Sequence, residues 1–134
     1  MKRLQGKRVL VTQADTYMGP ATVEIFPEFG AEIITDTSDL TDPDRAQALI
    51  NESGDIDILV VNLAAPPSLG VPAAELDDTI WQGMFDIMVH PLHRLCRAVL
   101  PQMMARKKGK IIVFGSATGL KAMQGLSAYS AARH

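Results

Sequence analysis

Four short apolar segments, separated by stretches with helix signals, constrain the fold of this chain more than any other feature. They cover residues 8–12, 31–35, 56–61 and 110–114, and are rich in Val, Ile and Leu. Apolar runs of this length and composition predict buried strands. Strands that alternate with helices form a parallel sheet whose right-handed crossovers cover both faces. The sequence therefore predicts the α/β class, with a doubly wound parallel sheet.

The segments between these strands carry helix start and stop signals. Pro20 suits the first position of a helix, and Pro27 is expected to stop or kink that helix early. A second helix is predicted from a cap at Thr41 or Asp42 to about residue 51. A long helix should run from residues 75–77 to about 106, with Pro91 as a candidate interruption, and a last helix should begin around residues 125–127.

Length and composition fit a single globular domain over residues 1–134. Of the 134 residues, 47% are apolar and 21% are charged, which is enough to form a core. The net charge of −2 and the lack of a long basic run exclude a nucleic-acid surface or a polybasic membrane anchor. Cys96 is the only cysteine, and no apolar run is long enough for a signal peptide or a membrane span. A cytoplasmic protein with no bound metal is expected.

The strongest chemical signal is the spacing of Ser116, Tyr129 and Arg133. In a parallel sheet, ligands bind beyond the carboxyl ends of the strands, and Ser116 follows the last predicted strand. Tyr129 and Arg133 lie one turn apart on the last predicted helix, so the guanidinium favours the phenolate and makes Tyr129 a better base. Ser116 can hold the substrate oxygen. The alternative is that Ser116 caps a turn while the other two residues are ordinary helix residues.

The turn after the first strand is the second signal. Glycines in such a turn let the backbone approach a pyrophosphate, but here Gln13 and Tyr17 stand at the first two glycine positions and only Gly19 remains. The Tyr17 ring would fill cofactor space, and the Asp15 carboxylate would repel a pyrophosphate. The alternative is a glycine loop that has lost its function.

These segments together resemble the short-chain dehydrogenase/reductase superfamily over nearly the whole chain. The matching segments are the VLVT turn, the DILVVN strand, the AVLPQM helix, the GKIIVFGSATG strand and AYSAAR. Two features are most similar to the halohydrin dehalogenases of that superfamily: Ser-x12-Tyr-x3-Arg, and Thr-x4-Tyr-x-Gly at Thr12, Tyr17 and Gly19. Dehydrogenases of the superfamily carry Lys at the Arg133 position and a relay Asn at the Met88 position.

The resemblance implies a Rossmann-like sheet and a lyase that converts vicinal haloalcohols to epoxides. It implies that Tyr129 takes the hydroxyl proton, Ser116 holds that oxygen, Arg133 keeps Tyr129 ionised, and the alkoxide displaces the halide. The turn residues Thr12, Tyr17 and Gly19 would form the halide or anion site, with Asn62 and Ala64 as pocket candidates. No cofactor is implied. The partners would be a vicinal haloalcohol, or an epoxide with a small anion, and a second copy of the chain in a homodimer or homotetramer.

Two other hypotheses stay open. The first is an NAD- or NADP-dependent oxidoreductase with an atypical turn, in which Thr12, Gly19, Asp36 and Asn62 bind the cofactor; without a cofactor, Asp36 is expected to be a solvated turn residue. The second is a non-catalytic module that keeps the fold. The resembling fold continues through further strands and helices, so the sequence is expected to be the N-terminal part of a longer protein, incomplete at its C-terminal side.

Overall fold

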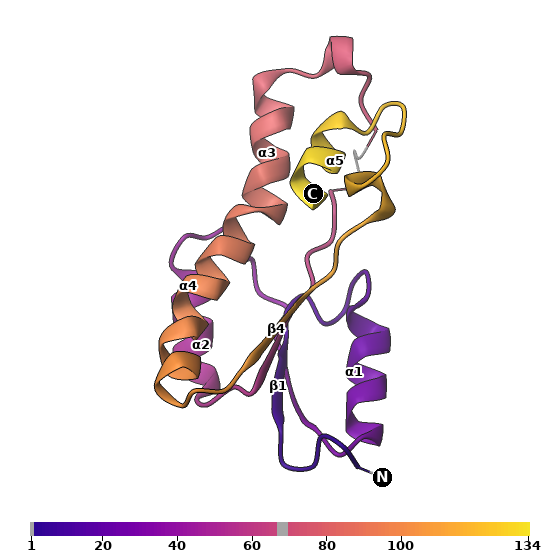
Figure 1. Cartoon of the computed structure of the whole chain (residues 1–134). Helices are drawn as coiled ribbons and strands as arrows, with labels where there is room; N and C mark the ends of the chain where they lie inside the picture. Colours follow the sequence, from indigo (N-terminus) through magenta and orange to yellow (C-terminus); the bar gives the residue numbers. More distant parts are fainter. Residues whose placement is uncertain (1, 67–69) are drawn as a thin grey trace.

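A four-stranded parallel sheet forms the centre of the protein. The computed structural model describes residues 2–66 and 70–134, and the strand order is β2-β1-β3-β4 (Figure 1). Every neighbouring pair is parallel. The strands are β1 (Arg8–Val11), β2 (Glu32–Thr35), β3 (Ile58–Val61) and β4 (Lys110–Val113). The predicted α/β class with a Rossmann-like parallel sheet is confirmed.

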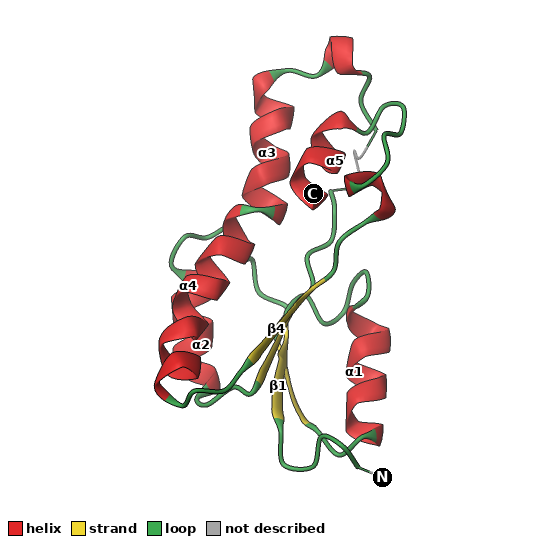
Figure 2. Ribbon diagram, viewed as in Figure 1, coloured by secondary structure: helices red, strands yellow, loops and turns green. Residues whose placement is uncertain are grey.

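Helices lie on both faces of this sheet, as Figure 2 shows. On one face, α1 (Gly19–Glu28) covers strand residues that include Val9, Val11 and Val60. On the other face, α2 (Arg45–Ser53) and α4 (His90–Ala105) cover Leu10 and Leu59. Successive residues of each strand point to opposite faces, and both faces are covered at the centre, so β3 is apolar throughout and β1 is apolar after Arg8.

A second packing unit stands beyond the carboxyl ends of the strands. It consists of α3 (Asp78–Met88) and the short α5 (Ser127–Arg133), which lie side by side in Figure 1. Met84 and Met88 of α3 pack against Ala128 and Tyr129 of α5 in one buried cluster. The short 3-10 helices η1 (Ala73–Glu75) and η2 (Ala117–Gly119) lead into these elements.

The long helix predicted between residues 75 and 106 is two helices. The break falls at Val89, and Pro91 lies in the first turn of α4. Proline has no N–H to donate to the preceding turn, so the hydrogen-bond ladder restarts there. By contrast, Pro27 does not end α1 early, because it lies in the last turn, one residue before the helix ends.

The helix predicted to have its cap at Thr41 or Asp42 has Asp44 at the cap position and begins at Arg45. Side chains compete with helical bonding in this segment: Asp39 accepts the backbone N–H of Thr41 at 2.9 Å, and Asp42 accepts that of Asp44 at 3.0 Å. Such local bonds give the backbone an alternative to a helical turn.

Cover over the sheet stops short of β4. Its residues Ile112 and Val113 are 38% and 47% exposed, whereas all four residues of β3 are buried. The prediction of a sheet covered on both faces therefore holds for the centre of the sheet and not for this edge. Within residues 2–66 and 70–134, no helix has the length and apolar character to cross a membrane.

Candidate active site

The carboxyl ends of β1 and β3 are joined by buried polar side chains. Thr12 and Asn62 are both fully buried; the Thr12 hydroxyl donates to the Asn62 carbonyl at 2.9 Å and accepts the Asn62 N–H at 3.0 Å. The Asn62 amide donates to the carbonyls of Gln13 and Thr16 at 2.8 and 2.9 Å, and its oxygen accepts the N–H of Met18 at 3.3 Å. These bonds hold the β1–α1 turn in place.

That turn has the backbone of a glycine-rich loop, although Gln13 and Tyr17 stand where two of the glycines would be. Gln13 and Tyr17 have φ values of +44° and +52°, in the left-handed region that glycine adopts readily. Each such residue costs about 1–2 kcal/mol relative to a right-handed conformation. Gly19 is indispensable for a different reason, since a Cβ there would lie 2.5 Å from the Gln13 carbonyl oxygen.

Ser116 follows β4 at the same edge of the sheet. Its hydroxyl oxygen accepts two bonds from Thr118, at 2.9 Å from the side-chain hydroxyl and at 3.3 Å from the backbone N–H. Because Thr118 supplies protons to that oxygen, the Ser116 proton is available to another acceptor. Thr118 was not predicted from the sequence, although a Ser-x-Thr run after a strand is a signal for such a turn.

Arg133 links α5 to the ends of β3 and β4. Its Nη1 donates to the Phe114 carbonyl at 2.9 Å, Nη2 donates to the Leu63 carbonyl, and Nε donates to the Tyr129 hydroxyl at 3.3 Å. A planar guanidinium can serve three acceptors in fixed directions at once, which a lysine ammonium on a flexible stem does less well. The sequence predicted the pair with Tyr129 and missed the two carbonyls.

Tyr129 is buried, and its surroundings decide its proton affinity. Burial raises the pKa of Tyr129, but hydrogen bonds with Ser116, Arg133 and Tyr17, together with the Arg133 charge, outweigh it. The net pKa of Tyr129 therefore lies below its ordinary value of 10.0. The structure thus brings Ser116, Tyr129 and Arg133 together as the spacing predicted, and their catalytic role stays a prediction.

Tyr17 joins this group from the β1–α1 turn. Its ring centroid lies 4.9 Å from the Arg133 guanidinium carbon, which also lies 5.4 Å from the Tyr129 ring centroid. The Tyr17 hydroxyl makes a long bond of 3.4 Å to the Gly115 carbonyl, and its ring meets Phe114 edge-on at 6.4 Å. Tyr17 therefore spans the space between the turn and the group around Tyr129.

The surroundings of Asp36 contradict the expectation that it is a solvated turn residue. It is 7% exposed, accepts from the Ser38 hydroxyl at 2.8 and 2.9 Å, and forms an ion pair with Arg45 at 3.3 Å. It is therefore not a solvated turn residue. The Ser38 hydroxyl and the Arg45 guanidinium that hold it in place could not be inferred from its position at the end of β2.

The remaining predicted site residues fall into two groups. Thr12, Asn62 and Gly19 are buried and hold the β1–α1 turn in its shape, and contact with a ligand stays a prediction for them. Ala64 is half-buried, and its N–H donates to the Gln13 side chain at 2.7 Å. A place in the pocket stays a prediction for Ala64.

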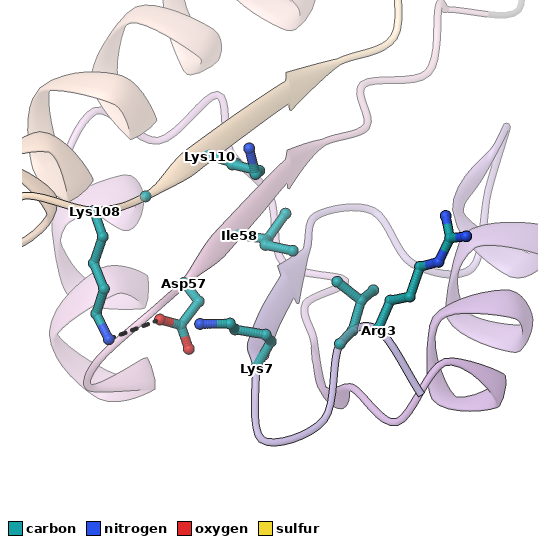
Figure 3. A pocket seen from close by; sticks show the side chains of 8 residues that line it. Arg3, Lys7, Asp57, Ile58, Lys108 and Lys110 are labelled. Atoms are coloured by element: carbon teal, nitrogen blue, oxygen red, sulfur yellow. Dashed lines mark ion pairs between the residues drawn. The ribbon is translucent and has the colours of Figure 1, made fainter. Parts of the chain in front are cut away.

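Two hollows lie at opposite ends of the sheet. One of about 450 Å³ borders the site and is lined by Ser116, Gly119, Leu120 and Arg133 among others. The other, of about 410 Å³, is shown in Figure 3; it lies at the amino ends of the strands, where Lys7 and Lys108 lie beside Asp57 and Arg3 points away from it. The second hollow is far from Ser116 and Tyr129 along the strand direction, so only the first of the two lies beside the predicted catalytic residues. Over the described residues, no cluster of His, Cys, Asp or Glu could hold a metal ion.

A doubly wound parallel sheet with polar side chains gathered beyond the carboxyl ends of its strands is typical of the nucleotide-binding α/β folds. The family model for "short chain dehydrogenase" matches residues 3–134. The chain belongs to the short-chain dehydrogenase family.

Similarity to known proteins agrees with membership of this family. The chain is 31% identical to a 3-oxoacyl-[acyl-carrier-protein] reductase of Vibrio harveyi, covering 97% of this chain and 63% of the relative. It is 30% identical to an uncharacterised oxidoreductase of Bacillus subtilis, covering 96% and 58%. A short-chain dehydrogenase from Mycobacterium smegmatis has the same fold, with a TM-score of 0.90, 24% identity and coverage of 99% and 66%. The chain spans about three fifths of the length of these curated relatives.

The comparisons overturn one interpretation made from the sequence. The predicted function of a halohydrin dehalogenase is wrong, because these relatives are a reductase and an oxidoreductase. That prediction gave most weight to Arg133 and Tyr17, whereas similarity to the oxidoreductases extends over nearly the whole chain. The expected absence of a cofactor loses its support with it.

Proposed function

We propose that this chain carries the dinucleotide-fold part of an NAD- or NADP-dependent oxidoreductase that interconverts a hydroxyl and a carbonyl group on a small molecule. The observation that carries the proposal is the bond of 3.3 Å from Arg133 to the Tyr129 hydroxyl, with Ser116 close enough to lower the pKa of Tyr129, in a family whose relatives are named as an oxidoreductase and a reductase. The alternative of a non-catalytic module does not explain why a buried phenol is held against a guanidinium.

The chain's own residues handle the proton. In the oxidative direction, the ionised Tyr129 oxygen takes the proton of the substrate hydroxyl, and the O–H bonding electrons remain on the substrate oxygen. Ser116 donates a hydrogen bond to that oxygen, since Thr118 already bonds to the Ser116 oxygen. Arg133 stabilises the phenolate before the transfer, which sets the base strength of Tyr129.

The backbone of the β1–α1 turn fits a dinucleotide, whereas two of its side chains do not. When bound, NAD or NADP would supply the hydride acceptor or donor. The turn backbone fits it, because the left-handed Gln13 and Tyr17 keep the shape of a glycine loop that approaches a pyrophosphate. The side chains in their present positions do not: Asp15 is an exposed carboxylate on the turn, and the Tyr17 ring lies between the turn and Arg133. We therefore derive no hydride step from this geometry.

The proposed function is tested by steady-state assays of the purified protein. A panel of secondary alcohols and ketones with NAD(P)+ or NAD(P)H is expected to give turnover detectable by nicotinamide absorbance. Tyr129→Phe should lower kcat at least about 100-fold, because general acid–base groups contribute this much.

Ser116→Ala is expected to lower kcat as well, whereas Ser127→Ala, an exposed serine at the start of α5, should leave it unchanged. Turnover that survives in Tyr129→Phe would show that the site is wrongly assigned. A lack of cofactor-dependent turnover and of cofactor binding would reject the oxidoreductase itself.

A further inference from the structure

Tyr17 is in an unfavourable place for an ordinary turn residue. Its φ of +52° is in the region that favours glycine, so a tyrosine there carries a conformational cost that glycine would not. Strained residues of this kind cluster at functional sites, and an observed outlier justifies a functional hypothesis.

The contacts of the Tyr17 ring offset this cost. Its face lies against the Arg133 guanidinium at 4.9 Å, its edge geometry with Phe114 is near perpendicular at 87°, and its hydroxyl reaches the Gly115 carbonyl. All three contacts cross from the β1–α1 turn to residues that follow β4 or lie on α5. The ring is nevertheless 48% exposed, so it can leave this position without unpacking the core.

This position coincides with the path that a cofactor must take. A dinucleotide held by its pyrophosphate at the β1–α1 turn must extend to the substrate held at Ser116 and Tyr129 in order to exchange a hydride. The straight course between those two places is the space that the Tyr17 ring fills. Both cannot be there together.

We infer that Tyr17 is a resident plug: its side chain competes with the dinucleotide for the space between the β1–α1 turn and Arg133, and so sets cofactor affinity. This inference rests on the proposed function, because it takes a dinucleotide as the ligand. The state with Tyr17 against Arg133 is the cofactor-free state, and binding moves the ring into solvent. Affinity is reduced by the fraction of molecules in which the plug is in place.

The magnitude follows from the contacts that must break. A cation–π contact at a half-exposed site and an edge-on aromatic pair together contribute enough to change an equilibrium about tenfold. Removing the ring should therefore tighten cofactor binding by about that factor.

The test is calorimetric titration of the purified protein with NADH and with NADPH. Tyr17→Ala and Tyr17→Gly are expected to bind about tenfold more tightly than the wild type, and Tyr17→Phe, which keeps the ring, should stay within about twofold of it. Gln13→Gly is the control for backbone strain, because it relieves the same kind of strain in the same turn and leaves the Tyr17 ring in place, while it also removes the bond from the Ala64 N–H. Glycine adopts the positive φ at position 17 readily, so Tyr17→Gly is expected to fold even if Tyr17→Ala does not.

Each outcome has a distinct meaning. If the wild type binds cofactor and the two ring-deleting variants bind no more tightly, the plug is refuted while the proposed function stands. If Gln13→Gly tightens binding as much as Tyr17→Gly, turn strain rather than the ring controls affinity, and the plug is again refuted. If the wild type and all variants bind neither NADH nor NADPH, the plug and the oxidoreductase fail together.

Discussion

Replacing Arg133 should raise the pKa of Tyr129, and the chain offers a clean way to measure it. Only two tyrosines are present, so Tyr17→Phe leaves Tyr129 as the sole phenol that titrates. In that background, Arg133→Gln removes the bond of 3.3 Å to the Tyr129 oxygen together with the positive charge. Burial raises the pKa of Tyr129, and without Arg133 fewer interactions remain to lower that pKa.

The expected size of the change comes from the distance. An opposite charge this close lowers the pKa of an acid by about 1–3 units, and the half-buried guanidinium favours the lower part of that range. We therefore expect the pKa of Tyr129 to rise by about 1–2 units, equivalent to about 1.4–2.7 kcal/mol. Arg133→Lys keeps the positive charge but loses the planar guanidinium. The pKa of Tyr129 in this variant should therefore lie between its values with Arg133 and with Gln at this position.

The assay is the near-ultraviolet absorbance of the phenolate, followed through a pH titration of the folded protein. Circular dichroism over the same pH range is the control for unfolding. A pKa of Tyr129 that stays the same or falls in Arg133→Gln would refute the argument that Arg133 tunes this phenol.

Three further predictions concern stability and pH. Asn62→Ala, which removes three bonds between β3 and the turn, should lower the free energy of unfolding by about 3 kcal/mol in urea denaturation. Gly19→Ala should destabilise the protein by about 1–3 kcal/mol, whereas its control Gly83→Ala, in a helix with open space around the new methyl, should stabilise it by about 0.5–1 kcal/mol. Because the pKa of Tyr129 is lowered in the folded state, its phenolate should stabilise the protein as pH rises from the folded pKa towards 10.0, and this contribution should be absent in Tyr129→Phe.

The sheet could be predicted from the sequence because its signal is local and redundant. β3 is apolar along its whole length and β1 is apolar after Arg8, a pattern typical of a parallel sheet that lies between two layers of helices. Helix boundaries were less certain since they depend on single side chains. The bonds of Asp39 and Asp42 delayed α2, and neither appears in the apolar periodicity.

The arrangement of the predicted catalytic residues could be inferred in part for a similar reason. Tyr129 and Arg133 are one helical turn apart, so their contact follows from the helix alone. The Arg133 bonds to Phe114 and Leu63 connect residues 19 and 70 positions apart, and no local pattern carries them. The same is true of Tyr17, whose ring reaches a residue on the last helix.

The function was misjudged because a few residues were given more weight than the frame around them. Arg133 in place of Lys and Tyr17 in place of glycine were interpreted as the loss of a cofactor. The backbone shows why this does not follow: the turn keeps left-handed φ values at both substituted positions, so the shape that approaches a pyrophosphate survives the change of side chain. A side chain can rotate away from a binding path more easily than a backbone can rebuild one.

Arg133 connects the fold and the chemistry more closely than any other residue of the site. Its guanidinium holds the carbonyls that end β3 and β4 and at the same time polarises Tyr129, so any substitution of it disturbs both. Loss of activity in an Arg133 variant is therefore ambiguous by itself. Tyr129→Phe resolves the ambiguity, because it removes the acidic proton and leaves both Arg133 bonds to the strands intact. If Tyr129→Phe keeps wild-type stability and loses turnover, whereas Arg133→Gln loses both, the two roles of Arg133 are separate and both are real.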